Sequence, residues 1–159
     1  MDFCTADLCD KYDEKINVVA PIFKSFGGVS SFSGRIATCK LLDNNKKLIE
    51  LLKSDGKERV CVVDVEAKFI AVVGDNLMAL AKKNNWKGII VNGYVRDTKI
   101  TKNIEVGLLA LGVCPKKAQA ENFGELGCTL KFGGVKFFQD NYIYVDNDGV
   151  IVSKEPLYL

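Results

Sequence analysis

The sequence contains no histidine. This absence excludes Ser-His-Asp and Cys-His hydrolysis, histidine-ligated zinc, and proton transfer by imidazole near neutral pH. Any chemistry that the protein performs must therefore use carboxylates, Arg, Lys, Tyr, Cys, backbone groups, or a metal ion held by oxygen atoms.

A strong charge of either sign and a long apolar run are also missing. The chain has 22 Lys plus Arg and 20 Asp plus Glu, a net charge of +2, so no strong field favours nucleic acid or an anionic membrane. No apolar run approaches the roughly 20 residues that cross a bilayer. The acidic segment 1–15 lacks the basic and then apolar pattern of a secretory signal. We expect a soluble, cytoplasmic protein without direct nucleic-acid or membrane partners.

The cysteines lack the pairwise spacing of a metal knuckle or a thioredoxin-like motif. There are six, and none forms a C-x-x-C pair. We therefore expect reduced thiols that are buried or idle. Their positions are Cys4, Cys9, Cys39, Cys61, Cys114 and Cys128.

The length and the even composition favour one domain over residues 1–159. A chain of this size can bury roughly two thirds of its unfolded surface in a single core. We find no internal repeat, low-complexity linker or break in composition.

Helix and strand signals alternate through the middle of the chain. A short helix through Lys11 is expected, with Thr5 as its cap. Further helices are expected within 43–57, on apolar Leu48, Leu51 and Leu52 with Gly56 as a stop, and after Gly74-Asp75-Asn76, on Leu77, Leu80 and Ala81. Strands are expected at Gly34–Leu42, from Arg59 to Val65, and at Gly88–Gly93.

Beyond residue 97 the pattern changes to short strands, at 105–112, 128–138 and 142–153. The Asp146-Asn147-Asp148-Gly149 stretch is interpreted as a hairpin turn, because the further ligands and closing Glu of a calcium loop are missing. Alternating elements with β-rich ends predict a layered α/β domain with a mixed sheet or two sheets.

Two local features could carry chemistry, and the first is Gly74-Asp75-Asn76-Leu77 at the start of a predicted helix. A helix N-terminus offers unpaired amides and positive dipole character, which suit a small carboxylate. The alternative is that Asp75 or Asn76 only caps the helix, since both residue types are common caps.

The second feature is Arg96-Asp97, directly after the strand "IIVNGYV". Ligand sites of α/β sheets gather beyond the carboxyl ends of strands. Arg binds carboxylates through two parallel hydrogen bonds, and Asp is a hard oxygen ligand for Mg²⁺ or Mn²⁺. The alternative is an ordinary surface ion pair.

The segments "TADLCDKY", "FKSFGGVSSFSGRIATCK", "GDNL", "VNGYVRD", "FGGVKFF" and "YVDNDGVIVS" resemble the RraA family over nearly the whole chain. That family includes regulators of ribonuclease E and metal-dependent aldolases that cleave 4-hydroxy-4-methyl-2-oxoglutarate. The resemblance implies a swivelling β/β/α domain in a ring-shaped homotrimer, or a stacked hexamer, with active sites at subunit junctions.

The spacing of Asp75 and Arg96-Asp97 is similar to the aldolase signature. It implies that Gly74, Asp75, Asn76 and Leu77 cradle the substrate, a small 2-oxo acid. Arg96 would hold its pyruvyl oxygens, and Asp97 would anchor the divalent cation, Mg²⁺ or Mn²⁺. The signature usually continues with an acidic residue, whereas this chain has Thr98-Lys99-Ile100-Thr101-Lys102.

Three other interpretations remain. The regulator branch would inhibit ribonuclease E by binding it and its RNA helicases. A Schiff-base aldolase would need a desolvated Lys such as Lys136. A menaquinone methyltransferase would need a nucleotide-binding G-x-G-x-x-G fingerprint after a strand, and this sequence contains none. Tyr94, at the end of the buried strand and beside the proposed site, could pack in the core or contact substrate, and we expect it in the core.

Overall fold

The computed structural model describes residues 2–119 and 123–159, and its helices mostly follow the predicted pattern. In this part of the chain, no helix is both long and apolar enough to cross a membrane. The helices are α1 (Thr5–Tyr12), α2 (Lys46–Lys53), α3 (Asp75–Lys83) and α4 (Thr98–Thr101), with a 3₁₀ turn at Asp13–Lys15.

The strands form one mixed sheet and a separate hairpin. In the large sheet the order is β1-β12-β11-β3-β4-β6-β7-β2, with β5 paired to β6 and β8 to β3. The strands of this sheet are β1 (Ile16–Val18), β2 (Lys24–Ser25), β3 (Phe32–Lys40), β4 (Val60–Asp64), β5 (Ala71–Val73), β6 (Gly88–Val95), β7 (Gly107–Val113), β8 (Glu125–Leu126), β11 (Tyr142–Val145) and β12 (Val150–Ser153). The hairpin is β9 (Leu130–Phe132) and β10 (Val135–Phe137).

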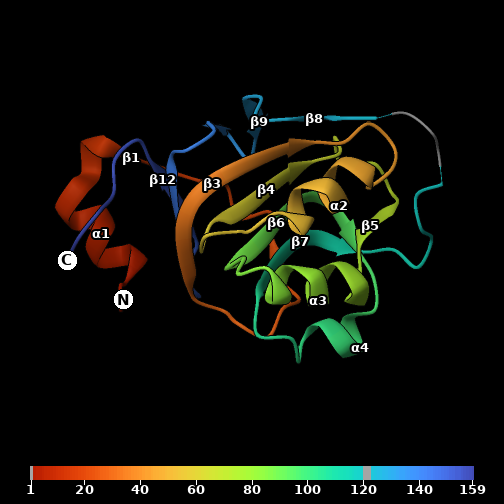
Figure 1. Ribbon diagram of the computed structural model, residues 1–159. Coiled ribbons are helices and arrows are strands. Elements are labelled where there is room, and N and C mark those ends of the chain that lie inside the picture. The colour runs from red at the N-terminus through yellow and green to blue at the C-terminus, as the bar shows by residue number, and fades with distance from the viewer. Residues whose placement is uncertain (1, 120–122) are drawn as a thin grey trace.

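Strands β3, β4, β6 and β7 are parallel and make the centre of the domain. Alternate side chains point to opposite faces of a strand. In β4, Cys61 and Val63 pack with Leu48 of α2 and Met78 of α3. Figure 1 shows α2 and α3 in front of these strands.

The other face of the same strands packs against a second β layer. Val62 of β4 and Ile90 of β6 share a cluster with Phe137 of β10, Ile143 of β11 and Val152 of β12. The three layers are therefore helices, parallel strands and a second set of strands, which confirms the predicted fold class.

Several predicted boundaries were wrong by a few residues. Strand β3 begins at Phe32 and ends at Lys40, and α2 ends at Lys53 before Gly56 is reached. The 128–138 stretch is a hairpin whose turn residues Gly133 and Gly134 have φ of 60° and 75°. Left-handed φ values at both central residues match the twist of a hairpin.

Thr5 does not cap α1, because Cys4 is the N-cap residue. Instead, the Thr5 amide and hydroxyl donate to the two carboxylate oxygens of Asp146, each over 2.7 Å. Asp146 follows β11 in the β11–β12 hairpin, and this hairpin confirms the predicted turn. The hydrogen bonds tie the first helix to a segment that lies 141 positions later.

The attachment of α1 through Asp146 should depend on pH. Burial alone would raise the pKa of the Asp146 carboxyl, but the hydrogen bonds from Thr5 and from the Asp148 and Gly149 backbone outweigh burial and lower the pKa. The stabilisation is therefore present above the ordinary Asp pKa of about 3.9 and is lost as the pH falls through the lowered value. Thermal unfolding should show wild type losing its advantage over Asp146→Asn in that acidic range. Asp148→Asn is the matched control.

Candidate active site

Strand β6 places Arg96 and Asp97 beside the start of α3. Strand β5 runs parallel to β6, and the Arg96 amide donates to the Val73 carbonyl oxygen over 3.0 Å. Gly74 and Asp75 follow β5 directly, so the two predicted segments meet at the carboxyl edge of the sheet. This is the edge at which α/β sheets bind ligands.

The six predicted site residues line one cavity of about 60 Å³. Five further residues line it from neighbouring segments. The full lining is Asn45, Ala71, Val72, Val73, Gly74, Asp75, Asn76, Leu77, Arg96, Asp97 and Lys117.

Asp97 has a left-handed backbone, with φ 59° and ψ 32°. Its carbonyl oxygen accepts the Ile100 and Thr101 amides of α4, while its side chain makes no capping hydrogen bond to that helix. The carboxylate is instead turned toward α3, where Oδ2 accepts the Asp75 amide over 3.3 Å. A non-glycine residue in this conformation is uncommon, and such residues cluster at functional sites.

Gly74 makes this approach of the carboxylate possible. A Cβ atom on Gly74 would lie 2.4 Å from Asp97 Oδ2, well inside van der Waals contact. The φ of Gly74 is −140°, an extended value that any residue adopts. The close approach of the Asp97 carboxylate, and not the backbone conformation, therefore requires glycine here.

Neither Asp75 nor Asn76 is the cap of α3. Gly74 is the N-cap residue, without a side-chain cap, and Asp75 Oδ1 accepts the neighbouring Asn76 amide over 2.8 Å. Asp75 therefore brings a second carboxylate to the cavity, at the positive end of a helix dipole.

Arg96 and Asp97 form only a loose ion pair. Arg96 Nε lies 4.0 Å from Asp97 Oδ2, and the two side chains are 38% and 37% exposed. Arg96 Nη1 also donates to the Pro115 carbonyl oxygen over 3.4 Å. Because a half-exposed pair at this distance contributes little to stability, the guanidinium can serve a ligand at small cost.

Asn45 and Lys117 were missed from the sequence. Asn45 precedes α2, and its Nδ2 donates to the Val72 carbonyl oxygen over 3.1 Å. Lys117 is carried to the cavity by the segment after β7, because the Ala71 amide donates to the Lys116 carbonyl oxygen over 2.8 Å. Both residues stand in lysine- or asparagine-rich stretches without a local signal, so only the folded chain reveals them.

The RraA-like family model, described as Aldolase/RraA, matches residues 5–152. The chain belongs to this family.

Three relatives are similar to this chain over almost their whole length. A Bacillus cereus protein, provisionally named as a 4-hydroxy-4-methyl-2-oxoglutarate aldolase, is 44% identical over 97% of this chain and 98% of its own. The RNA-processing inhibitor RraA from Thermus thermophilis has a TM-score of 0.94 at 35% identity, over 99% of this chain and 96% of its own.

A Geobacillus kaustophilus protein, named an S-adenosylmethionine: 2-dimethylmenaquinone methyltransferase, also has a TM-score of 0.94 at 35% identity. That match covers 98% of this chain and 97% of the other. The three names differ in activity although the fold is shared, so a function must be argued from the site itself.

Tyr94 was expected in the core, and this prediction was wrong. It is half-buried, and its ring packs edge-on against the exposed ring of Phe69, with 5.0 Å between centroids. Side chains alternate along β6, and the neighbouring Val95 takes the core position.

Lys136 is exposed on β10 and lines a different hollow with Lys15 and Lys154.

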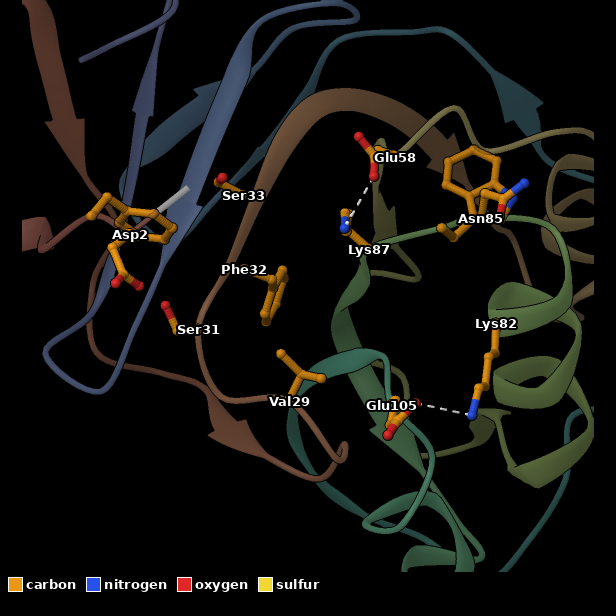
Figure 2. Close-up of a pocket in the computed structure, with 12 residues that line it drawn as sticks. Asp2, Val29, Ser31, Phe32, Ser33, Glu58, Lys82, Asn85, Lys87 and Glu105 are labelled. Carbon is orange, nitrogen blue, oxygen red and sulfur yellow. Dashed lines mark ion pairs between the residues drawn. The ribbon is translucent and has the colours of Figure 1, made fainter. Parts of the chain in front are cut away.

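A wider hollow, of about 420 Å³, lies at the opposite edge of the parallel strands. Figure 2 shows two ion pairs there, Lys82 with Glu105 and Lys87 with Glu58, each at 3.2 Å. All four side chains are at least half exposed. Solvent-exposed charges that already pair with each other are poorly suited to bind or activate a substrate. The larger volume of this hollow therefore does not make it the active site.

The six cysteines are free, as the sequence predicts. Cys39, Cys61 and Cys114 are buried, and burial raises the pKa of the Cys39 thiol to about 12. The thiolate is the reactive form of cysteine, so such a group is inert near neutral pH. Cys4 lies with Asp146 and Asp148 in a group whose ligand atoms are within 4.8 Å of one another, but Thr5 already occupies the Asp146 oxygens.

Proposed function

We propose that the protein is a divalent-metal-dependent aldolase that cleaves 4-hydroxy-4-methyl-2-oxoglutarate-type substrates to pyruvate and also decarboxylates oxaloacetate. The observation that carries the proposal is the Asp97 carboxylate, turned into a cavity beside Arg96 and the N-terminus of α3. The whole chain is taken as one functional unit, working as a homotrimer.

The donor set fits a hard cation such as Mg²⁺ or Mn²⁺. Asp97 offers carboxylate oxygens in the cavity, with Asp75 beside it. Mg²⁺ commonly takes one or two protein carboxylates and fills its remaining positions with water and substrate. In this proposal Asp97 holds the cation, directly or through water. A bound dication would supply a Lewis acid for the negative oxygen of the pyruvate enolate, which both reactions generate.

The chain's own residues would bind and orient the substrate. Arg96 would hold the carboxylate and 2-oxo oxygen of the pyruvyl group through its planar fork of donors. The first-turn amide of Leu77 would face the same anionic end. Lys117, on the cavity wall, would pair with the far carboxylate of a dicarboxylic substrate. These fixed charges need no reorganisation as the carbon–carbon bond breaks, and that is the main source of such catalysis.

Removal of metal gives the direct test. Purified protein with Mg²⁺ should decarboxylate oxaloacetate faster than Mg²⁺ alone, because the enolate forms in a preorganised site. EDTA should abolish the difference, and excess Mg²⁺ should restore it. Consumption of oxaloacetate can be followed by its ultraviolet absorbance. Activity that survives thorough chelation would rule out the metal role of Asp97.

A second candidate function is inhibition of ribonuclease E by direct binding, with its RNA helicases as further partners. It is favoured by the 35% identity to a protein named an RNA-processing inhibitor. The same preparation should therefore be tested for binding to the scaffold region of ribonuclease E. Inert protein that binds this region would replace the aldolase proposal with the regulator, whereas activity together with binding would assign both.

A further inference from the structure

A row of polar side chains crosses the parallel strands outside the candidate active site. Lys40 of β3 lies opposite Asp64 of β4, and Asp64 lies opposite Asn92 of β6. Asp64 shares its strand face with Val60 and Val62, which pack against the second β layer. The row is therefore on the face away from α2 and α3, at the carboxyl ends of the strands.

Asp64 is buried, with 7% of its side chain exposed, and joins three segments. Lys40 Nζ donates to Oδ2 over 2.9 Å, Asn92 Nδ2 donates to Oδ1 over 2.9 Å, and the Glu66 amide donates to Oδ1 over 2.8 Å. A buried ion pair is weak evidence for stability, because desolvation offsets the attraction. The question is therefore what the geometry of this row controls.

The row is hydrogen-bonded to the turn at residues 65–68, whose backbone conformation is unfavourable for non-glycine residues. Glu66 and Ala67 have left-handed φ values of 54° and 55°. The Lys68 amide donates to the Val65 carbonyl oxygen over 3.2 Å, which closes the turn. Two successive non-glycine residues in this region persist only where the surroundings fix them.

Asn92 makes several of the hydrogen bonds that fix this turn. Its carbonyl oxygen accepts the Ala67 amide over 3.1 Å and the Val65 amide over 3.4 Å. Its side chain holds Asp64, which in turn holds the Glu66 amide. One residue of β6 therefore binds the turn through both its backbone and its side chain.

The turn sets where the chain returns to β6. Strand β4 pairs with residues 88–92 of β6, and β5 pairs with residues 94 and 95 in the same direction. Strand β7 pairs with the other side of β6, so β4 and β5 lie on the same side of β6, one after the other. They form one strand that is interrupted by residues 65–70, which leave the sheet and return to it. Strand β5 then leads directly into Gly74.

We propose that Asp64 and Asn92 are positioning residues, which fix the 66–67 turn and thereby the place of the 74–77 segment beside Arg96 and Asp97. The activity readout of this inference rests on the proposed function. Neither residue lines the candidate active site, so the effect is transmitted through the register of β5 on β6.

Asn92→Asp gives a conservative test, because it replaces a donor with a carboxyl that faces Asp64. Two facing carboxyls share a proton at low pH, and their repulsion raises the pKa of one of them. The hydrogen bond is therefore present below that raised pKa and is lost as the pH rises through it. Other charged groups at this hollow are Lys40, Glu66, Glu125 and Lys131.

For Asn92→Asp, the kcat relative to wild type should fall about tenfold or more between about pH 5 and about pH 8, since small misplacements cost such factors. KM should change little, and circular dichroism should show folded protein throughout. Relative to wild type at the same pH, the variant's protection of the Ala67 and Arg96 amides against hydrogen exchange should fall over the same range. The double variant Asp64→Asn/Asn92→Asp leaves one carboxylate, and its kcat ratio should not vary with pH. Lys131→Ala, in the same hollow, is the matched control.

The outcomes separate the two proposals. Inactive wild-type protein would contradict the proposed function, while exchange at Arg96 would still test the positioning. A kcat ratio, or an exchange rate relative to wild type, that stays constant with pH for Asn92→Asp would overturn the positioning, whatever the activity. A pH slope that persists in the double variant, or appears in Lys131→Ala, would also overturn it.

Discussion

Asp97→Asn is expected to lower kcat/KM for oxaloacetate decarboxylation by about 10²–10³-fold, the usual effect of removing one electrostatic group from an active site. Asn keeps the shape of the side chain and tolerates the left-handed backbone of position 97. The variant therefore removes the charge that holds the cation in the proposed function, without straining the chain. Steady-state kinetics over a range of Mg²⁺ concentrations should show the loss, together with weaker metal dependence.

Asp97→Ala should lose the same activity, with an additional loss of stability of about 1 kcal/mol, because alanine disfavours the left-handed region. Comparing the two variants separates the effect of charge from that of the backbone. Thermal unfolding and size-exclusion chromatography should show that Asp97→Asn stays folded and keeps the assembly state of the wild type. Dissociation of the assembly, or wild-type rates, would make Asp97 a structural residue.

Gly74→Ala should lower activity by about 10²-fold, the size expected when reacting groups are displaced by about 1 Å. The new Cβ would lie 2.4 Å from Asp97 Oδ2, so either the carboxylate or the start of α3 must move. The φ of −140° is open to alanine, so the free energy of unfolding should change by only about 1 kcal/mol, as for other cap substitutions. Kinetics and chemical denaturation of the same preparation measure both quantities.

Gly112→Ala is the matched control for Gly74→Ala. A Cβ at Gly112 would lie 3.4 Å from the ring of Tyr94, which is an ordinary contact, and Gly112 does not line the cavity. This variant should keep its activity. Equal losses in the two variants would mean that any added methyl near β6 is disruptive, and the specific role of Gly74 would be abandoned.

The sequence predicted the elements whose signals are local. Strand β4 is fully buried and rich in valine, as its pattern indicates. In α3 the predicted Ala81 is buried, but the other buried residue is Met78, and the predicted Leu77 and Leu80 are only partly buried against the core. Strand β5 has only three residues, and its pairing with β6 is determined by tertiary contacts. Tyr94 was placed wrongly because it follows a buried run, whereas alternation along the strand turns it toward Phe69.

The candidate site divides in the same way. Arg96 and Asp97 could be found because they end a strong strand, and Gly74 to Leu77 because they begin a helix. Their convergence could not be derived from either segment alone, since it depends on the Arg96 to Val73 hydrogen bond. Lys117 has no local signal at all, because the Ala71 to Lys116 hydrogen bond brings it to the cavity from a later crossover.

The pairing of early and late segments has a consequence for synthesis on the ribosome. Strand β1 pairs with β12, and α1 packs on Tyr144 and Ile151, while the Tyr158 amide donates to the Tyr12 hydroxyl over 3.2 Å. Residues 5–18 therefore wait for the much later residues 142–158 before they can dock. Meanwhile the nascent chain exposes Leu8 and the edge of β3 that later pairs with β11, and chaperones would be needed during this interval.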